Sequence, residues 1–454
     1  MEIERIFAKI AAVISPSKAE LQAEKKFAAE IIKKLESKLP KTCNVSFVGS
    51  AARDTGLRGD RDIDLFAAFP REMDEEVIVK KTFAAAKNSV KAKWITHYAE
   101  HPYLQTTVDG FKVEVIPCFQ VEPHSGIKSA VDRSPLHMQY LEKKLTQRQR
   151  RDVRVLKKLL KVHQIYGAEV EVGGFSGLVC EQLMLKYGGL ENLLREAAKW
   201  LPPIYIDYEG TWNAENKSGK MELMHKFPDA KFILIDVIDR NRNAAAAVSP
   251  QSLAKFILLS RAFVKKPSES FFIEKKKVHN AAKVQQLLHA RGTTFVMVEM
   301  KKPDVIEDIL FPQLKRSEKN ISRELQKSGF RVFGSCDNYA KGQLLFEIEN
   351  ACLVSVKKLV GPPAWLEKNV SQFLKNKKII RGPYLEEEKI CLDIRQSETS
   401  VEKILKAILA SGSTGISSHW QKPAKNGKAR MVKKIDASNV QILAKYLLET
   451  VEWV

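Results

Sequence analysis

One feature most constrains the fold and chemistry of this chain: a Gly-Ser turn followed by a strand that begins with two aspartates. The stretch from Phe47 to Phe69 reads FVGSAARDTGLRGDRDIDLFAAF. Because side chains alternate along a strand, Asp62 and Asp64 point to one face while Ile63 points to the other, toward a core. Two adjacent carboxylates repel unless they are solvated, protonated or bridged by a cation. An Asp-x-Asp triplet also occurs at ordinary strand ends, so the pattern alone leaves a structural interpretation open.

Two neighbouring features favour a binding site. Gly49 and Ser50 form a turn whose backbone N–H groups and hydroxyl suit a phosphate. Glu114, in the predicted strand FKVEVIPCF, faces away from its two flanking valines, so an adjacent strand could carry it to the aspartates. Asp109 competes for this third position, but it precedes Gly110 in a predicted hairpin turn, where Asp is ordinarily structural.

Three carboxylates in a cleft suit a hard divalent cation. Such oxygen ligands favour Mg²⁺, which keeps waters and substrate phosphates in its other positions, and the sequence does not distinguish Mg²⁺ from Mn²⁺. Two ions can activate an attacking hydroxyl and stabilise a leaving pyrophosphate in an in-line displacement. The pattern therefore predicts nucleotidyl transfer with Mg²⁺ as the cofactor.

The charge balance predicts a polyanionic partner. The chain carries 75 Lys and Arg against 54 Asp and Glu, a formal net charge of +21. Such an excess attracts nucleic acid, although a merely soluble basic surface produces the same balance.

Hydropathy and cysteine content indicate the compartment in which the protein works. No apolar run approaches the roughly 18 residues that cross a bilayer, and acidic residues at positions 2 and 4 are unlike a signal peptide. We therefore expect a cytoplasmic protein with no membrane partner. The six cysteines are scattered without a C-x-x-C pair, so we interpret them as small buried hydrophobic residues. The oligomeric state stays open, and a homodimer is one arrangement that the sequence allows.

The periodicity of apolar residues predicts an α+β, multidomain fold. A small α/β head, residues 1–140, combines a helix over 19–38 with the strands CNVSFVGS, DIDLFAAF and KVEVIPCF. A helical central domain, residues 141–265, contains the amphipathic stretch 152–167 and a helix after Ser249, a predicted N-cap.

The remaining residues, 266–454, alternate strands with helices and predict an α+β body and tail. The predicted strands are TTFVMVEM, QLLFEIE and KICLDIR, and the predicted helices span 317–329, 363–376 and 400–410. The polar, basic stretch HWQKPAKNGKARMVKK, residues 419–434, is interpreted as an exposed loop or linker.

At this point the motifs carry a family resemblance. The stretch VGSAARDTGLRGDRDIDLF resembles the signature of the polymerase-β-like nucleotidyltransferases, and further stretches narrow the match to archaeal-type, class I, CCA-adding enzymes. These stretches, which thin out after about residue 380, are SAVDRSPLH (129–137), VRVLKKLL (153–160), IYGAEVEVGGFSG (165–177), DRNRNAAA (239–246), KKPDVIEDILFPQLKR (301–316) and GPP (361–363).

The resemblance implies a tRNA nucleotidyltransferase that builds or repairs the 3′-terminal CCA of tRNA from CTP and ATP without a nucleic acid template. It implies that the head carries catalysis, that the central domain completes the nucleotide pocket, and that the body and tail bind tRNA. Asp62, Asp64 and Glu114 match the metal ligands of the family. The third acid is more usually Asp in this family, and the longer Glu changes the reach of that ligand.

The resemblance also implies a set of nucleotide-binding residues. The matching positions are Ser50 and Arg53 beside the incoming nucleotide, His137, Lys157 and Tyr166 in the rest of the pocket, and Arg242 with Asn243 near the base.

Several of these residues have a structural alternative. Lys157 flanks the apolar stripe of its helix and could be a solvated lysine. His137 could be a satisfied structural histidine, Tyr166 a packing residue at a helix end, and Arg242 a surface charge.

Two other functions stay in view at this point. A poly(A) polymerase or another terminal nucleotidyltransferase would extend many RNAs, and a non-catalytic RNA-binding protein on the same scaffold would have no need of three acids.

Overall fold

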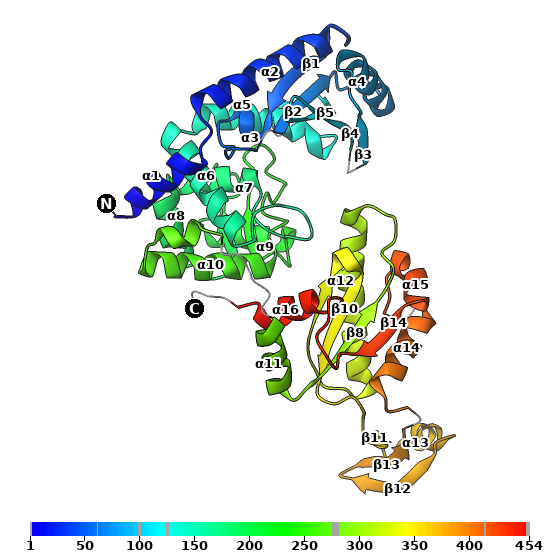
Figure 1. Ribbon diagram of the computed structural model, residues 1–454. Coiled ribbons are helices and arrows are strands. Elements are labelled where there is room, and N and C mark those ends of the chain that lie inside the picture. The colour runs from blue at the N-terminus through cyan, green and yellow to red at the C-terminus, as the bar shows by residue number, and fades with distance from the viewer. Residues whose placement is uncertain are drawn as a thin grey trace. The chain divides into compact units, whose positions relative to one another are not determined.

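The structure is a computed structural model, shown in Figure 1, that describes residues 2–60, 62–98, 101–123, 127–274, 281–396, 398–412 and 415–450. These residues group into two compact units, one ending at residue 274 and one spanning residues 281–450. Both units mix helices with sheets, which confirms the predicted α+β, multidomain fold. The finer division at residues 140 and 265 stays a prediction.

The elements are labelled in chain order. The first unit contains α1 (Glu2–Ile14), α2 (Lys18–Glu36), β1 (Asn44–Val48), α3 (Gly49–Ala52), β2 (Asp62–Phe69), α4 (Glu75–Ser89), β3 (Ile95–Tyr98), β4 (Pro102–Val108), β5 (Phe111–Phe119), α5 (Arg133–Lys144), α6 (Gln147–Val162), α7 (Gly177–Tyr187), α8 (Leu190–Ala197), β6 (Ile204–Ile206), α9 (Lys217–Lys226), β7 (Phe232–Leu234) and α10 (Pro250–Lys265). The second unit contains α11 (Ala281–Arg291), β8 (Thr294–Glu299), α12 (Glu307–Ser328), β9 (Val332–Asn338), β10 (Gln343–Ile348), β11 (Val356–Pro363), α13 (Glu367–Leu374), β12 (Ile379–Glu386), β13 (Lys389–Arg395), α14 (Val401–Ser411), α15 (Ser418–Lys425), β14 (Lys428–Met431) and α16 (Val440–Leu448).

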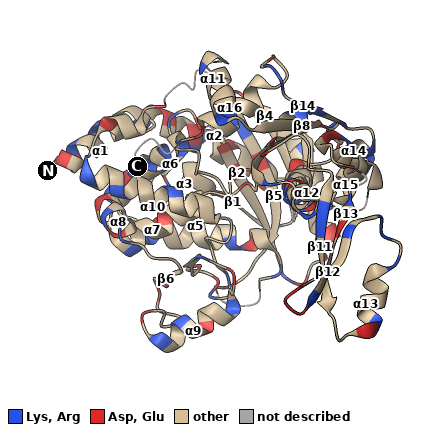
Figure 2. Cartoon of the chain, turned by 90° about the horizontal axis from the view of Figure 1, so that it is seen from below, with Lys and Arg blue, Asp and Glu red and all other residues tan. Residues whose placement is uncertain are grey.

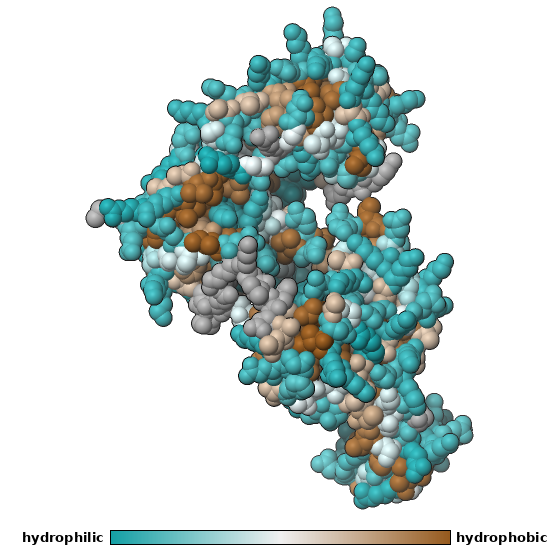
Figure 3. Space-filling model, viewed as in Figure 1, coloured by the Kyte–Doolittle hydropathy of each residue, from teal (hydrophilic) through white to brown (hydrophobic). Residues whose placement is uncertain are grey.

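Lys and Arg occur on elements of both units, as Figure 2 shows. The face drawn in Figure 3 is largely hydrophilic, with apolar residues in separate patches. Within the described ranges, no helix is both long enough and apolar enough to cross a membrane.

The N-terminal part of the first unit is built on a five-stranded sheet, here called the head sheet. Its strand order is β1-β2-β5-β4-β3. β2 and β5 run parallel, while the other neighbours in this sheet are antiparallel. Alternate residues such as Ile63 and Val113 are fully buried, and they pack in one core with side chains of α2 and α4. The opposite face of β2 and β5 carries acidic residues at the start of the strands, and further along it packs Phe66 and Ile116 into a second, smaller core.

The sequence predicted the main elements of the head. The predicted strands correspond to β1, β2 and β5, and the predicted helix over 19–38 corresponds to α2. Asp109 and Gly110 have φ angles of 52° and 77°, which confirms their place in the hairpin turn between β4 and β5. Asp109 is therefore a turn residue.

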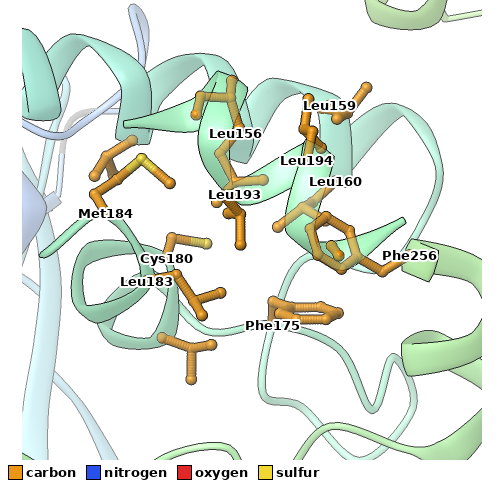
Figure 4. Close-up of a cluster of buried hydrophobic side chains, with 14 of the residues drawn as sticks. Leu156, Leu159, Leu160, Phe175, Cys180, Leu183, Met184, Leu193, Leu194 and Phe256 are labelled. Atoms are coloured by element: carbon orange, nitrogen blue, oxygen red, sulfur yellow. The ribbon is translucent and has the colours of Figure 1, made fainter. Parts of the chain in front are cut away.

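A helical core makes up most of the rest of the first unit. Figure 4 shows side chains of α6, α7 and α8 pointing toward one another, with Phe175 and Phe256 beside them. α1 also packs into this core, through Ile3 and Phe7. α10 begins as predicted, because the Ser249 hydroxyl accepts a hydrogen bond from a backbone N–H of the first helical turn.

The second unit is built on a body sheet with the strand order β14-β8-β10-β9, all antiparallel. Alternation along β8 sends Val296 and Val298 into a core with α12, α14 and α15. The same alternation sends Phe295 and Met297 into a second core with α11 and α16. Helices therefore cover both faces of this sheet.

A tail module, residues 353–399, lies between β10 and α14 and contains α13 with the sheet β11-β13-β12. Its ends are joined by backbone hydrogen bonds. Leu353 N donates to Thr399 O at 2.9 Å, and Val401 N donates to Ala351 O at 3.0 Å. The chain therefore enters and leaves the module at adjacent points.

Two sequence interpretations are wrong. The stretch 419–434, predicted as an exposed loop or linker, contains most of α15 and the strand β14. Trp420 in this stretch is fully buried, and its indole N–H donates to Leu310 O at 3.1 Å. Of the cysteines, all of which lie in described parts of the chain, Cys352 is exposed while the other five are buried as predicted.

Candidate active site

Three carboxylates and one lysine share a face of the head sheet. The parallel register of β2 and β5 places Asp64 opposite Glu114 and Asp62 opposite Lys112. All four side chains lie on the face opposite to Ile63, because strand positions two apart share a face. The structure thus brings together the acids that the sequence placed fifty residues apart.

The surroundings of Asp64 disfavour its charged form. Burial raises the pKa of Asp64 to about 7, and the charges of Glu114 and Asp62 add to this effect. The positive charges of Lys112 and Arg53 act in the opposite direction. Lys112 Nζ lies 2.7 Å from Glu114 Oε1 and 3.8 Å from Asp62 Oδ1. Lys112 therefore partly neutralises the cluster.

The donor chemistry of this cluster fits a divalent cation. Asp62, Asp64 and Glu114 offer hard carboxylate oxygens, and the raised pKa of Asp64 shows that the site favours added positive charge. As they are arranged, however, no three acidic, His or Cys side chains of the described residues are grouped to hold a metal ion. Lys112 bonds to Glu114 in this arrangement, so the acids would have to leave the ammonium group to converge on a cation.

Gly49 brings the backbone against this cluster. It follows β1 with φ of 84°, a conformation that favours glycine. A Cβ at this position would lie 2.1 Å from Asp64 Oδ2, so a larger residue would displace the Asp64 carboxylate. Ser50 is the next residue of α3, and its carbonyl oxygen accepts hydrogen bonds from the backbone N–H groups of Thr55 and Gly56. The Gly-Ser turn therefore lies beside the carboxylates, as the sequence predicted.

Helix α6 holds the loop that follows the Gly-Ser turn. Its basic residues at positions 150, 154 and 157 share one helical face and bond to the carbonyl oxygens of three consecutive loop residues. The donor and acceptor pairs are Arg150 with Arg53, Arg154 with Asp54 and Lys157 with Thr55. The helical core thus fixes the conformation of residues 53–55 in the head.

A buried carboxylate completes this junction. Glu181, on α7, accepts hydrogen bonds at Oε1 from Arg53 Nε at 2.9 Å and from Thr55 Oγ1 at 2.6 Å. Burial alone would raise the pKa of Glu181, but the charges of Arg53 and Lys157 and the two hydrogen bonds hold it below its usual value. Two predicted nucleotide-binding residues therefore share one buried counter-ion.

Lys157 is buried, not solvated. Its side chain is only 2 % exposed, and Nζ donates to Thr55 O at 2.9 Å. Burial lowers the pKa of its amine. The alternative of a solvated lysine is therefore wrong.

Tyr166 lies next to this lysine. A Cβ added to Gly177 would meet Tyr166 Oη at 3.4 Å and Lys157 Nζ at 3.6 Å, so the two groups flank the same glycine. Tyr166 forms a backbone bridge with Phe175, and the Lys161 ammonium lies 5.5 Å from the centre of its ring. Tyr166 is thus held between the ends of α6 and α7.

His137 and Arg242 both bond to Asp236, a second buried acid. His137 Nε2 lies 2.7 Å from Asp236 Oδ1, and Arg242 Nη1 lies 2.5 Å from Asp236 Oδ2. Burial alone would raise the pKa of Asp236, yet the hydrogen bond and charge of His137 and the nearby Arg242 hold it far below its usual value. The Arg242 side chain is 37 % exposed, so this acid orients a guanidinium that still reaches the surface.

The side-chain amide of Asn243 forms hydrogen bonds with the backbone. Its Oδ1 accepts hydrogen bonds from the N–H groups of Leu234 and Ala245, and its Nδ2 donates to Phe232 O. A role in nucleotide binding would therefore act through the loop that Asn243 holds.

Sequence reasoning missed several residues of this site. They are Lys112, Arg150, Arg154, Glu181 and Asp236. A helical pattern that places basic residues 150, 154 and 157 on one face could have indicated the contacts of α6. No local pattern around Glu181 distinguishes it from a surface acid.

Comparison with known proteins identifies relatives of this chain. Family models match residues 13–137 as a nucleotidyltransferase domain, 151–273 as the second domain of tRNA nucleotidyltransferases, and 291–427 as the C-terminal domain of CCA-adding enzymes. The CCA-adding enzyme of Methanoregula boonei is 37% identical over 375 residues, which cover 80% of this chain and 79% of that protein. The CCA-adding enzyme of Archaeoglobus fulgidus is 31% identical over 430 residues, which cover 94% and 92%. A solved structure of a cytoplasmic RNA terminal U-transferase aligns over 60% of this chain and 99% of its own, with 13% identity and a TM-score of 0.47.

Proposed function

Since this chain belongs to the CCA-adding enzyme family, we propose that it builds or repairs the 3′-terminal CCA of tRNA from CTP and ATP, releasing pyrophosphate. It is an enzyme, a tRNA nucleotidyltransferase. The observation that carries the proposal is the placement of Asp64 opposite Glu114, with Gly49 directly against the Asp64 carboxylate.

Asp62, Asp64 and Glu114 would hold divalent cations, for which Mg²⁺ is the proposed species. Such ions activate an attacking hydroxyl and neutralise the charge that develops on the phosphate and the leaving pyrophosphate. The raised pKa of Asp64 supports this assignment, because the site is stabilised by added positive charge.

Ser50, Arg53, Lys157 and Tyr166 would bind and orient the triphosphate. The guanidinium of Arg53 and the ammonium of Lys157 supply positive charge, and both are tied to the loop that follows the Gly-Ser turn. Holding the nucleotide in line with the 3′-hydroxyl reduces the entropic part of the barrier.

Arg242 would contact the base, since a guanidinium can satisfy the polar edges of cytosine or adenine. Its bond to Asp236, which also binds His137, supports this role because an oriented guanidinium selects better than a mobile one. Asn243 would stabilise the loop that carries Arg242.

The basic body and tail would bind tRNA through its backbone and shape, because the major groove of A-form RNA is too narrow to be read by side chains. The family match over residues 291–427 and the net charge of +21 support this role. We propose that the enzyme works in the cytoplasm, as a monomer or a homodimer.

One assay tests the proposed function. Purified protein with Mg²⁺ and labelled CTP or ATP is offered tRNA ending before CCA, after C and after CC, together with an unrelated RNA. We expect CTP to extend the first two substrates, ATP to extend the third, and the reaction to stop once CCA is complete. Long adenylate tails on every RNA would instead identify a poly(A) polymerase.

The Asp64→Asn variant provides the chemical control. Its side chain keeps the size of Asp64 but loses the charge, so incorporation should fall by about 100-fold or more while the fold is retained. Unchanged incorporation would contradict the assignment of Asp64 as a metal ligand.

A further inference from the structure

Glu181 is a fully buried carboxylate whose two hydrogen-bond donors, Arg53 and Thr55, lie more than 120 residues away along the chain. We propose that Glu181 is a positioning residue for nucleotide binding, which keeps Lys157 charged and orients Arg53 toward the triphosphate. This inference rests on the proposed function of the same site.

Only one of the two carboxylate oxygens of Glu181 accepts hydrogen bonds among the described residues. Oε1 accepts from both Arg53 Nε and Thr55 Oγ1, while Oε2 is buried and has no hydrogen-bond partner among the described residues. A buried carboxylate oxygen without a partner costs stability. The charge that Glu181 supplies therefore explains a carboxylate at this position better than its hydrogen bonds do.

The charge of Glu181 acts on Lys157 through space. Thr55 joins the two side chains, because its hydroxyl donates to Glu181 Oε1 at 2.6 Å and its carbonyl oxygen accepts from Lys157 Nζ at 2.9 Å. The groups that act on the pKa of Lys157 are Glu181 and Cys180 on α7 and Arg53 and Asp60 from the head, and the hydroxyl of Tyr166 lies beside the same glycine as Lys157 Nζ. Burial lowers the pKa of the lysine amine, and Arg53 lowers it further, whereas Glu181 is the strongest influence that raises it. Loss of the Glu181 charge would release the proton of Lys157 at a lower pH.

A protonated Lys157 matters because a neutral amine has little attraction for a triphosphate. Arg53 stays charged under all ordinary conditions, so Glu181 affects it through orientation alone. The proposal thus predicts an effect that depends on pH, which a merely structural carboxylate would not produce.

The experiment compares Glu181→Gln with Glu181→Asp, which keeps the charge. Equilibrium binding of ATP without tRNA, and kcat/KM for ATP on tRNA ending in CC, are measured from about pH 6 to about pH 10. In Glu181→Gln, the pH at which both quantities decline should be lower by about one unit or more. KM should rise about tenfold, with a smaller change in kcat, and lowering the pH should restore binding.

Asp152→Asn is the matched control. Asp152 is also a buried carboxylate of the helical core, bonded to Arg151 and to the backbone N–H of Leu190. This variant should lose stability without moving the pH profile, and Glu181→Asp should keep the profile of the unmodified protein. Identical profiles for Glu181→Gln and the unmodified protein would overturn the proposal.

A measurement on the unmodified protein covers the case in which Glu181→Gln does not fold. The Lys157 amine, followed by the ¹³Cε signal of labelled lysine assigned with Lys157→Gln, should be protonated at about pH 7.5. A neutral amine at that pH would also overturn the proposal. A protein that binds ATP with the expected pH dependence but does not extend tRNA would refute the proposed function and leave the role of Glu181 standing.

Discussion

Gly49 has no side chain, and the placement of Asp64 depends on that. The Gly49→Ala variant would bring a methyl group to 2.1 Å from Asp64 Oδ2 at a φ of 84°. We expect activity to fall by about 100-fold, because displacement of a reacting group by about 1 Å costs that much. Addition of labelled ATP to tRNA ending in CC measures the loss.

Gly59→Ala is the matched control for this prediction. Gly59 has a similar φ of 88°, but a Cβ there meets nothing within 4 Å. Both variants should lose about 1 kcal/mol of stability or more from the strained backbone, whereas only Gly49→Ala should lose activity. Equal activity in the two variants would show that the close approach to Asp64 is unimportant.

Asp236 predicts a pH dependence of stability. Its folded-state pKa lies below the usual value, so its carboxylate stabilises the folded protein above about pH 4. That contribution is lost as the pH falls through the lowered folded-state pKa. Asp236→Asn should therefore cost about 2–4 kcal/mol at neutral pH and progressively less in acid. Urea denaturation at several pH values measures the difference.

The exposed Asp229 supplies the comparison, because Asp229→Asn should change stability by less than about 0.5 kcal/mol at every pH. A cost for Asp236→Asn that does not vary with pH would contradict the electrostatic explanation.

The residues of the site differ in how far sequence predicts them. Strand alternation placed Asp62 and Asp64 on one face, and the same rule applied to FKVEVIPCF led to Glu114. Glu181 was missed because its two hydrogen-bond donors lie more than 120 residues away along the chain. Pairing over such a separation depends on how two helices pack, which local pattern does not encode.

Among the elements, α6 has the clearest testable role. Arg154 is buried and bonds to Asp54 and to Ser15 Oγ. Arg154→Ala should cost about 2–3 kcal/mol, because it leaves the Asp54 carboxylate without its cation. It should also raise KM for both nucleotides, since the loop over residues 53–55 would lose one of its supports. Steady-state kinetics and urea denaturation measure the two effects.

Arg148 on the same helix gives the control. Its side chain is 62% exposed and pairs with Glu4 at the surface, so Arg148→Ala should cost less than about 1 kcal/mol. Similar losses in the two variants would mean that the contacts of α6 with the loop add little.

Elements were predicted well where apolar periodicity is strong and poorly where local composition competes with packing. The strand DIDLFAAF corresponds to β2 over its full length. The prediction of a loop over 419–434 is wrong because Pro and Gly, which are typical of loops, here lie in and beside a helix whose packing decides its structure. In the structure, Trp420 and Ala424 bury one face of α15, and Pro423 lies within that helix. Burial of a tryptophan outweighs a modest local preference for loop structure.

For the whole molecule, the net charge of +21 predicts a strong salt dependence. tRNA binding should weaken by about 100-fold or more between about 50 and 200 mM salt, because bound phosphates release counterions. ATP binding to the protein alone should weaken much less, since it involves fewer charges. Filter binding and equilibrium dialysis measure the two affinities. A weak salt dependence of tRNA binding would contradict recognition through the RNA backbone.

Because hydrogen bonds join the ends of the tail module, changes in its length or sequence should be tolerated both in natural relatives and in engineered variants. With Leu353 N bonded to Thr399 O, the residues that begin and end the module are already neighbours. Everything between them can be lengthened, shortened or exchanged for another sequence while β10 still leads into α14. Natural insertions, deletions and designed fusions should therefore be tolerated at this junction more readily than elsewhere in the second unit.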